Sequence, residues 1–303
     1  MRRRTAGRPP SAGEGAGRSG DDAQRLELTL PVRGPYHAAW VFDFLDRRAL
    51  PGVEEVDGLR YRRRLFDSGR VLGDLLAVWE DDHLKVSLPV SATVGLGDLL
   101  ARLRRVFDLD ADPEAIEAVL AEDRRLRPIL AADPGLRVPG AWDGFEIAVR
   151  AILGQQVSVA RARDLAVLLC ERFGGGDFPA PAALVEADVS AIGMPGKRGE
   201  AVRALARAAL DGTLELHEGA DALALEAALV ALPGIGPWTA GYVSMRVARN
   251  PDGFPDADWV VLKVLSMTAA KARKAAEAWR PWRAYAVMAL WRQAGLARAA
   301  AAG

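Results

Sequence analysis

The sequence predicts an α+β protein in which an α/β unit comes first and an all-α region follows. Up to about residue 105, apolar and polar residues alternate in short segments, as they do along half-buried strands. From about residue 106 onward, apolar residues recur every three or four positions instead, as on the buried face of a helix. The chain has 303 residues, 50% of them hydrophobic, which is enough for about two globular domains with cores.

Residues 1–24 are expected to form a disordered basic lead. The segment "MRRRTAGRPPSAGEGAGRSGDD" is rich in Gly, Ser and Pro and lacks the apolar core of a secretory signal. No later run approaches the ~20 apolar residues that cross a membrane. We therefore expect a soluble, cytoplasmic protein that has no membrane partner.

Residues 25–105 are expected to form the α/β unit. Strand-like alternation occurs in "LELTLPV", "LRYRRRLF", "LLAVWE" and "HLKVSLPV". Between the first two segments, Tyr36, Trp40 and Phe44 recur every four residues, which predicts a helix with an aromatic face. These aromatic side chains are expected to pack in a core.

Residues 106–303 are expected to be all-α, with short Gly/Pro segments between the helices. The formal net charge of the chain is zero, but residues 263–303 contain eight Lys or Arg residues and one Glu. This local excess is compatible with a polyanionic partner and equally with a solvated helix face.

The sequence offers few ligands for a metal or cluster. Cys170 is the single cysteine and lies in an apolar helical pattern, which excludes an intrachain disulfide and a cysteine-ligated iron–sulfur cluster. His37, His83 and His217 are far apart and show no zinc-ligand spacing. We expect that the protein requires no cofactor.

The stretch "ALPGIGPWTAGYV" predicts a helix, a tight hairpin and a second helix. Gly234 and Gly236 can adopt backbone conformations that other residues avoid, and Pro237 suits the first turn of the following helix. The free N–H groups near Gly234, Gly236 and Thr239 would form a compact anion site. An ordinary helical hairpin without a ligand is the alternative.

About twenty residues later, "GFPDADWVVLKVL" delivers Asp256 and Asp258 to the start of an apolar helix. An aspartate at this position commonly caps the helix by accepting from its backbone N–H groups. Capping and catalysis are compatible with each other.

Together these two stretches resemble the helix-hairpin-helix, Gly/Pro-loop and aspartate signature of the base-excision DNA glycosylase superfamily. The segments "FEIAVRAILGQQVSVARA", "IGMPGKRGEAVRALARAALDGTL" and "RPWRAYAVMALWR" closely resemble the AlkA-type alkylpurine (DNA-3-methyladenine) glycosylases. The resemblance spans roughly Arg25 to Leu296. It implies an antiparallel, TBP-like N-terminal domain and a helical glycosylase core of two lobes that enclose the active-site cleft.

The resemblance also implies the catalytic group. It identifies Asp258 as the carboxylate that stabilises positive charge on the sugar and orients or deprotonates the attacking water. Asp256 is the rival, and the spacing to the apolar run favours Asp258. Trp238 stands where members that also cleave the strand carry a nucleophilic lysine, so the resemblance implies a monofunctional hydrolase.

Trp238, Tyr242 and Trp291 match the pocket aromatics of the family. A purine alkylated at a ring nitrogen carries a positive charge, which favours stacking on electron-rich rings by about 0.5–2 kcal/mol. The alternative is that these three side chains belong to the core.

The family's position for the residue that fills the gap in the opened duplex maps to Gln156, where some members carry leucine. A glutamine facing solvent is the alternative. The superfamily hairpin often binds a monovalent cation, Na⁺ or K⁺, through main-chain carbonyls, which here are those of Val230, Leu232 and Gly234.

The sequence as a whole predicts a monomeric DNA glycosylase of bacterial type that hydrolyses alkylated purines from duplex DNA by flipping the damaged base out of the helix. Two alternatives remain open. One is a glycosylase of the same superfamily that acts on another damaged base. The other is a catalytically silent DNA-binding protein that keeps the hairpin for phosphate contact.

Overall fold

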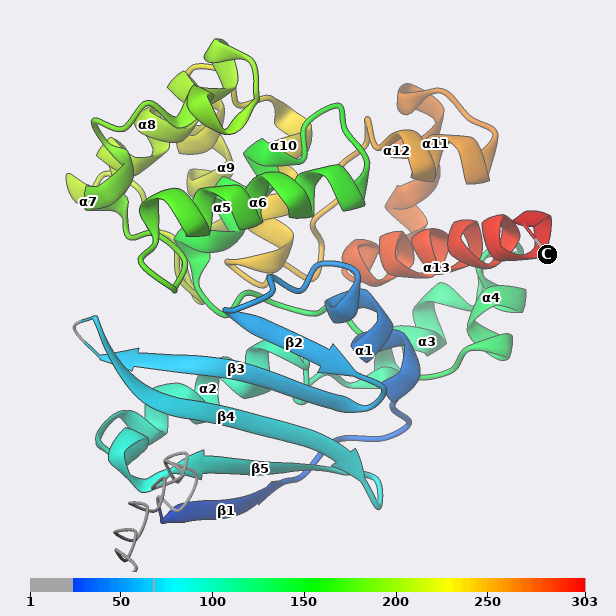
Figure 1. Ribbon diagram of the computed structural model, residues 1–303. Helices are drawn as coiled ribbons and strands as arrows, with labels where there is room; N and C mark the ends of the chain where they lie inside the picture. Colours follow the sequence, from blue (N-terminus) through cyan, green and yellow to red (C-terminus); the bar gives the residue numbers. More distant parts are fainter. Residues whose placement is uncertain (1–23, 68, 303) are drawn as a thin grey trace, which may run out of the picture.

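The computed structural model describes residues 24–67 and 69–302 (Figure 1). The expected disordered lead, residues 1–24, lies outside the described residues except for Gln24. Within the described residues, no helix is long and apolar enough to cross a membrane.

A five-stranded antiparallel sheet opens the chain and confirms the predicted α+β class. It contains β1 (Arg25–Leu30), β2 (Glu54–Asp57), β3 (Arg60–Asp67), β4 (Arg70–Glu80) and β5 (His83–Pro89), in the order β1-β5-β4-β3-β2. The register pairs Leu28 with Val86 and Leu26 with Leu88 across the first and last strands. The alternating leucines and valines therefore lie on one face, which is the face that a sheet buries.

Helices cover that buried face. Two of them are α1 (Ala38–Asp46), beside the end of β2 in Figure 1, and α2 (Leu96–Val106), behind the sheet, with the short 3₁₀ helix η1 (Val90–Gly95) leading into α2. Trp40 and Phe44 are buried on α1. This confirms the helix that the aromatic spacing predicted, but Tyr36 lies before its first residue.

The rest of the described chain is helical. It consists of α3 (Pro113–Leu120), α4 (Arg127–Ala132), α5 (Gly144–Leu153), α6 (Val159–Phe173), α7 (Pro181–Leu184), η2 (Val189–Ile192), α8 (Gly196–Leu210), α9 (Ala222–Val230), α10 (Pro237–Arg246), α11 (Trp259–Leu265), α12 (Ala269–Ala276), η3 (Glu277–Trp279) and α13 (Arg283–Ala302).

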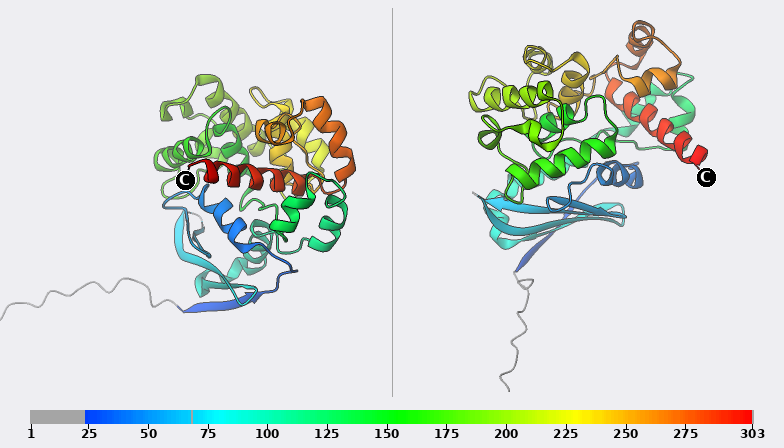
Figure 2. Two further views of the ribbon diagram at one scale, coloured as in Figure 1. Left: turned by 90° about the vertical axis from the view of Figure 1, so that its right-hand side faces the viewer. Right: turned by 45° about the horizontal axis from the view of Figure 1, so that its top comes forward.

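Two hydrophobic cores organise these helices. One core joins the sheet to α1, α2, α3, α4, α11, α12 and α13, and the other joins α5, α6, α8, α9 and α10. Figure 2 shows α13 between the upper helices and the α/β unit, where it extends the first core. Tyr242 packs against both cores, so it lies where the two cores meet.

A buried group of charged side chains fixes the sheet against α5. Arg63 of β3 pairs with Glu146 of α5 at 2.6 Å and with Glu54 at 3.1 Å, and Arg150 pairs with the same two carboxylates. Removing one member would leave an uncompensated buried charge, which is costly. The group therefore holds the α/β unit in one position relative to the helices that carry the site.

Candidate active site

Asp258 is the first residue of the site, and its own backbone geometry positions it. It occupies the N-cap of α11, where its Oδ1 accepts from the backbone N–H of Val261 at 2.9 Å. Its own backbone N–H donates to the carbonyl of Pro255 at 2.8 Å. The residue is buried, with 5% of its surface exposed. The capping expected from the sequence therefore holds the carboxylate in a single orientation.

Two tryptophans from other segments bond to the same carboxylate. The indole Nε1 of Trp238, on α10, donates to Oδ2 of Asp258 at 2.9 Å. The indole Nε1 of Trp291, on α13, donates to Oδ1 at 3.1 Å. Asp258 thus accepts three N–H groups from three different helices, α10, α11 and α13, which belong to the two hydrophobic cores.

The aromatic side chains form a continuous wall beside Asp258. Trp238 and Tyr242 are stacked, with ring centroids 5.5 Å apart and planes 10° from parallel. Tyr242 and Trp291 are 6.2 Å apart and tilted by 37°. All three are half-buried rather than enclosed in a core. Parallel aromatic faces beside a carboxylate can hold a flat, positively charged ring.

Two arginines lie behind this wall. Arg246, four residues after Tyr242 on α10, donates to the Tyr242 hydroxyl at 2.7 Å and to the carbonyl oxygens of Pro139 and Gly140. Burial raises the pKa of the Tyr242 phenol, but the positive charges of Arg246 and Arg48 outweigh it and lower the pKa to about 8. Burial also lowers the pKa of Arg48 to about 10.

Asp256 takes no part in this cluster of contacts. Its Oδ2 accepts from Nε of Arg273, on α12, at 2.5 Å, and its side chain is partly exposed. The cap of α11 is Asp258. Of the two candidate aspartates, Asp258 therefore has the contacts to the aromatic wall.

The predicted hairpin connects α9 to α10. Gly234 adopts a φ of +77°, and a Cβ there would lie 3.0 Å from the Cβ of Ala201. Gly236 is the N-cap of α10, with a φ of −96°, and no protein atom lies within 4 Å of the position that a Cβ would take there. Thr239 is buried in the first turn of α10. The turn thus needs a glycine at position 234, whereas nothing in the fold requires one at position 236.

Gln155, in the turn between α5 and α6, is hydrogen-bonded to the hairpin. Its Nε2 donates to the carbonyl of Gly234 at 3.0 Å and to Oγ1 of Thr239 at 3.1 Å. Gln156, the candidate gap-filling residue, is exposed in the same turn between α5 and α6 and has a φ of +57°. The structure therefore brings Gln156 close to the hairpin through the adjacent residue.

The carbonyls of Val230, Leu232 and Gly234, which the resemblance implies as cation ligands, lie where α9 ends. Val230 is the last residue of α9, and the last carbonyls of a helix lack intrahelical partners and carry the negative end of its dipole, whereas Leu232 and Gly234 follow in the hairpin. The carbonyls of Leu232 and Gly234 each accept one hydrogen bond, from Ile235 N and from Gln155, and a carbonyl oxygen has two lone pairs. Among the described residues, no group of three or more His, Cys, Asp or Glu could hold a metal ion.

Three residues of the site were not found from the sequence. Arg246 could have been found from its spacing, because residues four apart on a helix share a face and Arg246 follows Tyr242 by four. Gln155 is the neighbour of Gln156, but nothing local shows which of the two turns toward the hairpin. Arg48 lies almost two hundred residues before Tyr242, and no pattern in the sequence links them.

Comparisons with known proteins find similar sequences and a similar fold. The family model of the AlkA N-terminal domain matches residues 27–143. DNA-3-methyladenine glycosylase 2 of Escherichia coli (strain K12) is 38% identical over 279 residues, which cover 87% of this chain and 96% of that protein.

Two further relatives extend the comparison. The probable bifunctional transcriptional activator/DNA repair enzyme AlkA of Mycobacterium tuberculosis (strain CDC 1551 / Oshkosh) is 37% identical over 269 residues, or 85% of this chain. The match covers 52% of that protein, so the chain spans about half of its length. The solved structure of a 3-methyladenine DNA glycosylase from Archaeoglobus fulgidus has a TM-score of 0.76 at 21% identity and covers 88% of this chain and 98% of that one. This last likeness concerns the fold.

Proposed function

The chain belongs to the AlkA family of DNA-3-methyladenine glycosylases, and from this premise we propose that it is a monofunctional DNA glycosylase that hydrolyses alkylated purines from duplex DNA. One observation carries the proposal. The buried carboxylate of Asp258 accepts the indole N–H groups of Trp238 and Trp291, so the catalytic group and the aromatic wall form one hydrogen-bonded unit.

The damaged nucleotide must first leave the duplex. Extruding it costs a few kcal/mol of lost pairing and stacking, which a side chain that enters the gap offsets in part. Gln156 supports this role because it is exposed at a turn that Gln155 ties to the hairpin. Its amide would bond to the base left without a partner.

The extruded base would then stack on the wall formed by Trp238 and Tyr242. An alkylated purine is positively charged, and its attraction to the face of an aromatic ring adds about 0.5–2 kcal/mol to binding. The same charge makes the base a good leaving group. It departs as a neutral molecule when the glycosidic bond breaks and takes the bonding electron pair, so no general acid is needed.

Asp258 would act on the sugar. As the bond breaks, positive charge develops on the deoxyribose, and a carboxylate held rigidly in a water-poor site stabilises that charge. A water molecule then adds to the sugar carbon and loses its proton to Asp258 or to solvent. Trp238, which stands at the family's lysine position, has no amine to form a Schiff base, which supports hydrolysis without strand cleavage.

The hairpin would hold the DNA backbone. The N–H groups at the start of α10, near Gly236 and Thr239, suit a phosphate oxygen. A Na⁺ or K⁺ ion on the carbonyls of Val230, Leu232 and Gly234 would add positive charge beside that phosphate. We also propose that the protein acts as a monomer in the cytoplasm.

Base release from a methylated duplex tests the proposal. The native chain should release 3-methyladenine, and Asp258→Asn should slow release by about 100-fold or more. Asparagine is a good N-cap residue, so this variant keeps the start of α11, whereas Asp258→Ala should lose about 1 kcal/mol of stability as well.

The outcomes separate the candidate functions. No release by the native chain would favour the DNA-binding module, and faster release of a neutral lesion would favour a glycosylase for another damaged base. Unchanged release by Asp258→Asn would overturn the catalytic assignment.

A further inference from the structure

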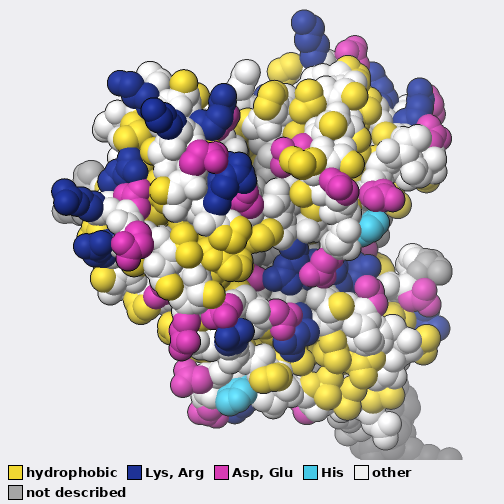
Figure 3. All heavy atoms as spheres, turned by 180° about the vertical axis from the view of Figure 1, so that it is seen from behind, with side chains coloured by type: hydrophobic (Ala, Val, Ile, Leu, Met, Phe, Trp, Pro, Cys, Tyr) yellow, Lys and Arg dark blue, Asp and Glu magenta, His cyan; other side chains and the backbone are white. Residues whose placement is uncertain are grey.

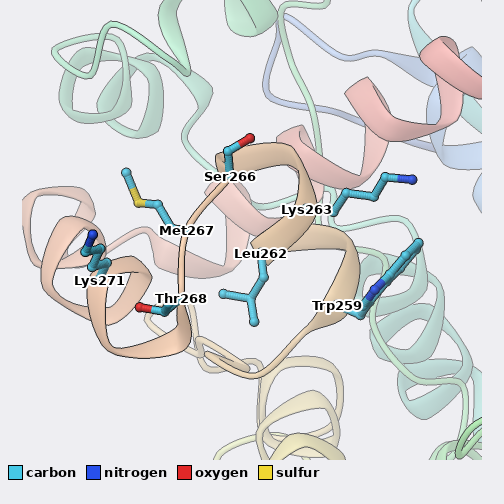
Figure 4. Close-up of a pocket in the computed structure, with 7 residues that line it drawn as sticks. All are labelled: Trp259, Leu262, Lys263, Ser266, Met267, Thr268 and Lys271. Carbon is cyan, nitrogen blue, oxygen red and sulfur yellow. The ribbon is translucent and has the colours of Figure 1, made fainter.

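A hollow of about 480 Å³ lies on the surface formed by α11 and α12, immediately after the proposed catalytic residue (Figure 4). Its lining residues are Trp259, Leu262, Lys263, Ser266, Met267, Thr268 and Lys271. Trp259 directly follows Asp258 in the chain, and 63% of its surface is exposed. The lining of the hollow thus begins one residue after Asp258 and includes no residue of the aromatic wall.

Two lysines border this hollow. In Figure 4, Leu262 lies between Lys263 and Lys271, and both lysines are exposed. Across the described residues, neither forms an ion pair with a carboxylate. Arg273, on the same helix as Lys271, does form such an ion pair, with Asp256. The two lysines thus leave two uncompensated positive charges on the rim of the hollow.

The remaining lining is suited to a sugar–phosphate chain. Leu262 and Met267 contribute apolar surface, and the exposed Ser266 and Thr268 contribute hydroxyl groups. The side chain of Thr268 makes no capping bond to α12, so its hydroxyl can donate elsewhere. Deoxyribose packs on apolar surface, while phosphate oxygens accept from ammonium and hydroxyl groups.

Trp259 is held as one wall of the hollow. The ammonium of Lys263 lies 4.9 Å from the centroid of the indole ring, and the two residues are one helical turn apart on α11. This contact keeps both side chains in place at an exposed site. Lys263 and Trp259 therefore form one side of the hollow through a direct contact.

We propose that this hollow is a second DNA subsite, which binds the backbone phosphates of the damaged strand next to the excised nucleotide. The proposal rests on the proposed function, because it requires the target sugar to lie at Asp258. The seven residues of α11 span about 10 Å at about 1.5 Å per residue. Since nucleotides rise by about 3.4 Å along each strand, a phosphate that contacts Lys263 on this helix lies within about three nucleotides of the excised base.

Binding to a duplex that contains an uncleavable abasic analogue tests the subsite without base release. Each phosphate contact contributes about 0.9 to the slope of log affinity against log salt concentration. Lys263→Gln and Lys271→Gln should each reduce that slope by about 1. Lys271→Arg, which keeps the charge, should retain most of it.

Lys274→Gln is the matched control. Lys274 is exposed on the same helix as Lys271 but does not line the hollow. Lys274→Gln changes the net charge by the same amount as Lys271→Gln, so a general electrostatic effect would lower the slope equally in the two variants. Equal slopes for Lys271→Gln and Lys274→Gln would overturn the proposal.

Neutral methylphosphonate linkages locate the contact. They are placed one at a time within about four nucleotides on each side of the abasic analogue. At one or two positions the linkage should weaken binding by the native chain about tenfold, whereas the affinity of Lys271→Gln should not change there. The absence of any such position would overturn the proposal. Base release from methylated duplex is measured separately, so a chain that shows the coupling but releases no base would contradict the proposed function while still showing that the hollow binds phosphates beside an abasic site.

Discussion

The indole Nε1 of Trp238 donates a hydrogen bond of 2.9 Å to Oδ2 of Asp258. Trp238 also stacks on Tyr242, so one side chain forms part of the aromatic wall and orients the carboxylate. Phenylalanine separates the two roles, because it keeps an aromatic ring but has no N–H.

Trp238→Phe is expected to slow base release by about tenfold or more, since a hydrogen bond to a charged group contributes about 1.5–3 kcal/mol. Single-turnover rates on methylated duplex measure this, alongside affinity for a duplex with an abasic analogue. Trp291→Phe is the control and should have a smaller effect, because Oδ1 of Asp258 still accepts from Val261. A loss of affinity without any loss of rate would show that Trp238 serves in binding alone.

Tyr242 makes the stability of the protein depend on pH. Its pKa is about 8 in the folded protein, against an ordinary value of 10. Between these values the unfolded chain binds more protons than the native one, so the free energy of unfolding rises with pH. Below about pH 8 this contribution is lost.

The free energy of unfolding of the native protein, minus that of Tyr242→Phe, should therefore increase between pH 8 and pH 10. The increase is at most about 3 kcal/mol, because one pKa unit corresponds to about 1.4 kcal/mol. Urea unfolding at a series of pH values measures it. A difference that stays constant over this range would contradict the effect of Arg246 and Arg48 on the phenol.

The two hairpin glycines should respond differently to alanine. Gly234→Ala is expected to lower the free energy of unfolding by about 1–2 kcal/mol, since alanine is strained at positive φ and its Cβ would crowd Ala201. Gly236→Ala should not destabilise the protein, because no protein atom lies near the added methyl group. It should nevertheless weaken DNA binding, as the methyl group would stand where the phosphate approaches. Thermal unfolding and duplex affinity distinguish the two variants, and undiminished affinity in Gly236→Ala would exclude a close phosphate there.

Gln156→Gly should change stability and activity in opposite directions. Gln156 has a φ of +57°, which strains any residue with a Cβ, so replacement by glycine is expected to stabilise the protein by about 1 kcal/mol. Without the side chain, release of a paired lesion should slow about tenfold, while release of an unpaired lesion should change little because its extrusion costs least. Comparing a lesion in a full duplex with one opposite a gap measures this. Equal slowing on both substrates would be inconsistent with a gap-filling role.

Surface charge by itself does not mark the proposed DNA-binding side. On the face shown in Figure 3, Lys and Arg side chains are interspersed with Asp and Glu. Many of the basic residues are paired, as in the contacts of Arg283 and Arg280 with Asp252. The excess of basic residues from position 263 onward includes paired arginines as well as Lys263 and Lys271, which form no ion pair among the described residues. Only these unpaired lysines support the proposed subsite.

The α+β class, the hairpin and the capping aspartate could be predicted from the sequence because each depends on residues close together in the chain. Strand alternation, the four-residue spacing of Tyr36, Trp40 and Phe44, and an aspartate before an apolar helix are all local patterns. The resemblance to the family then assigned roles to Asp258 and Trp238, which lie twenty residues apart.

Packing between distant segments decided the rest. The carboxylate of Asp258 meets Trp291 from α13, and Arg48 from the end of α1 acts on Tyr242 of α10, although no periodicity relates these positions. Tyr242 contacts both cores, of which one joins the sheet to the C-terminal helices and the other contains α5 to α10. Local sequence sets the elements and their caps, whereas the contacts that make them a site arise when buried surfaces from different parts of the chain fit together.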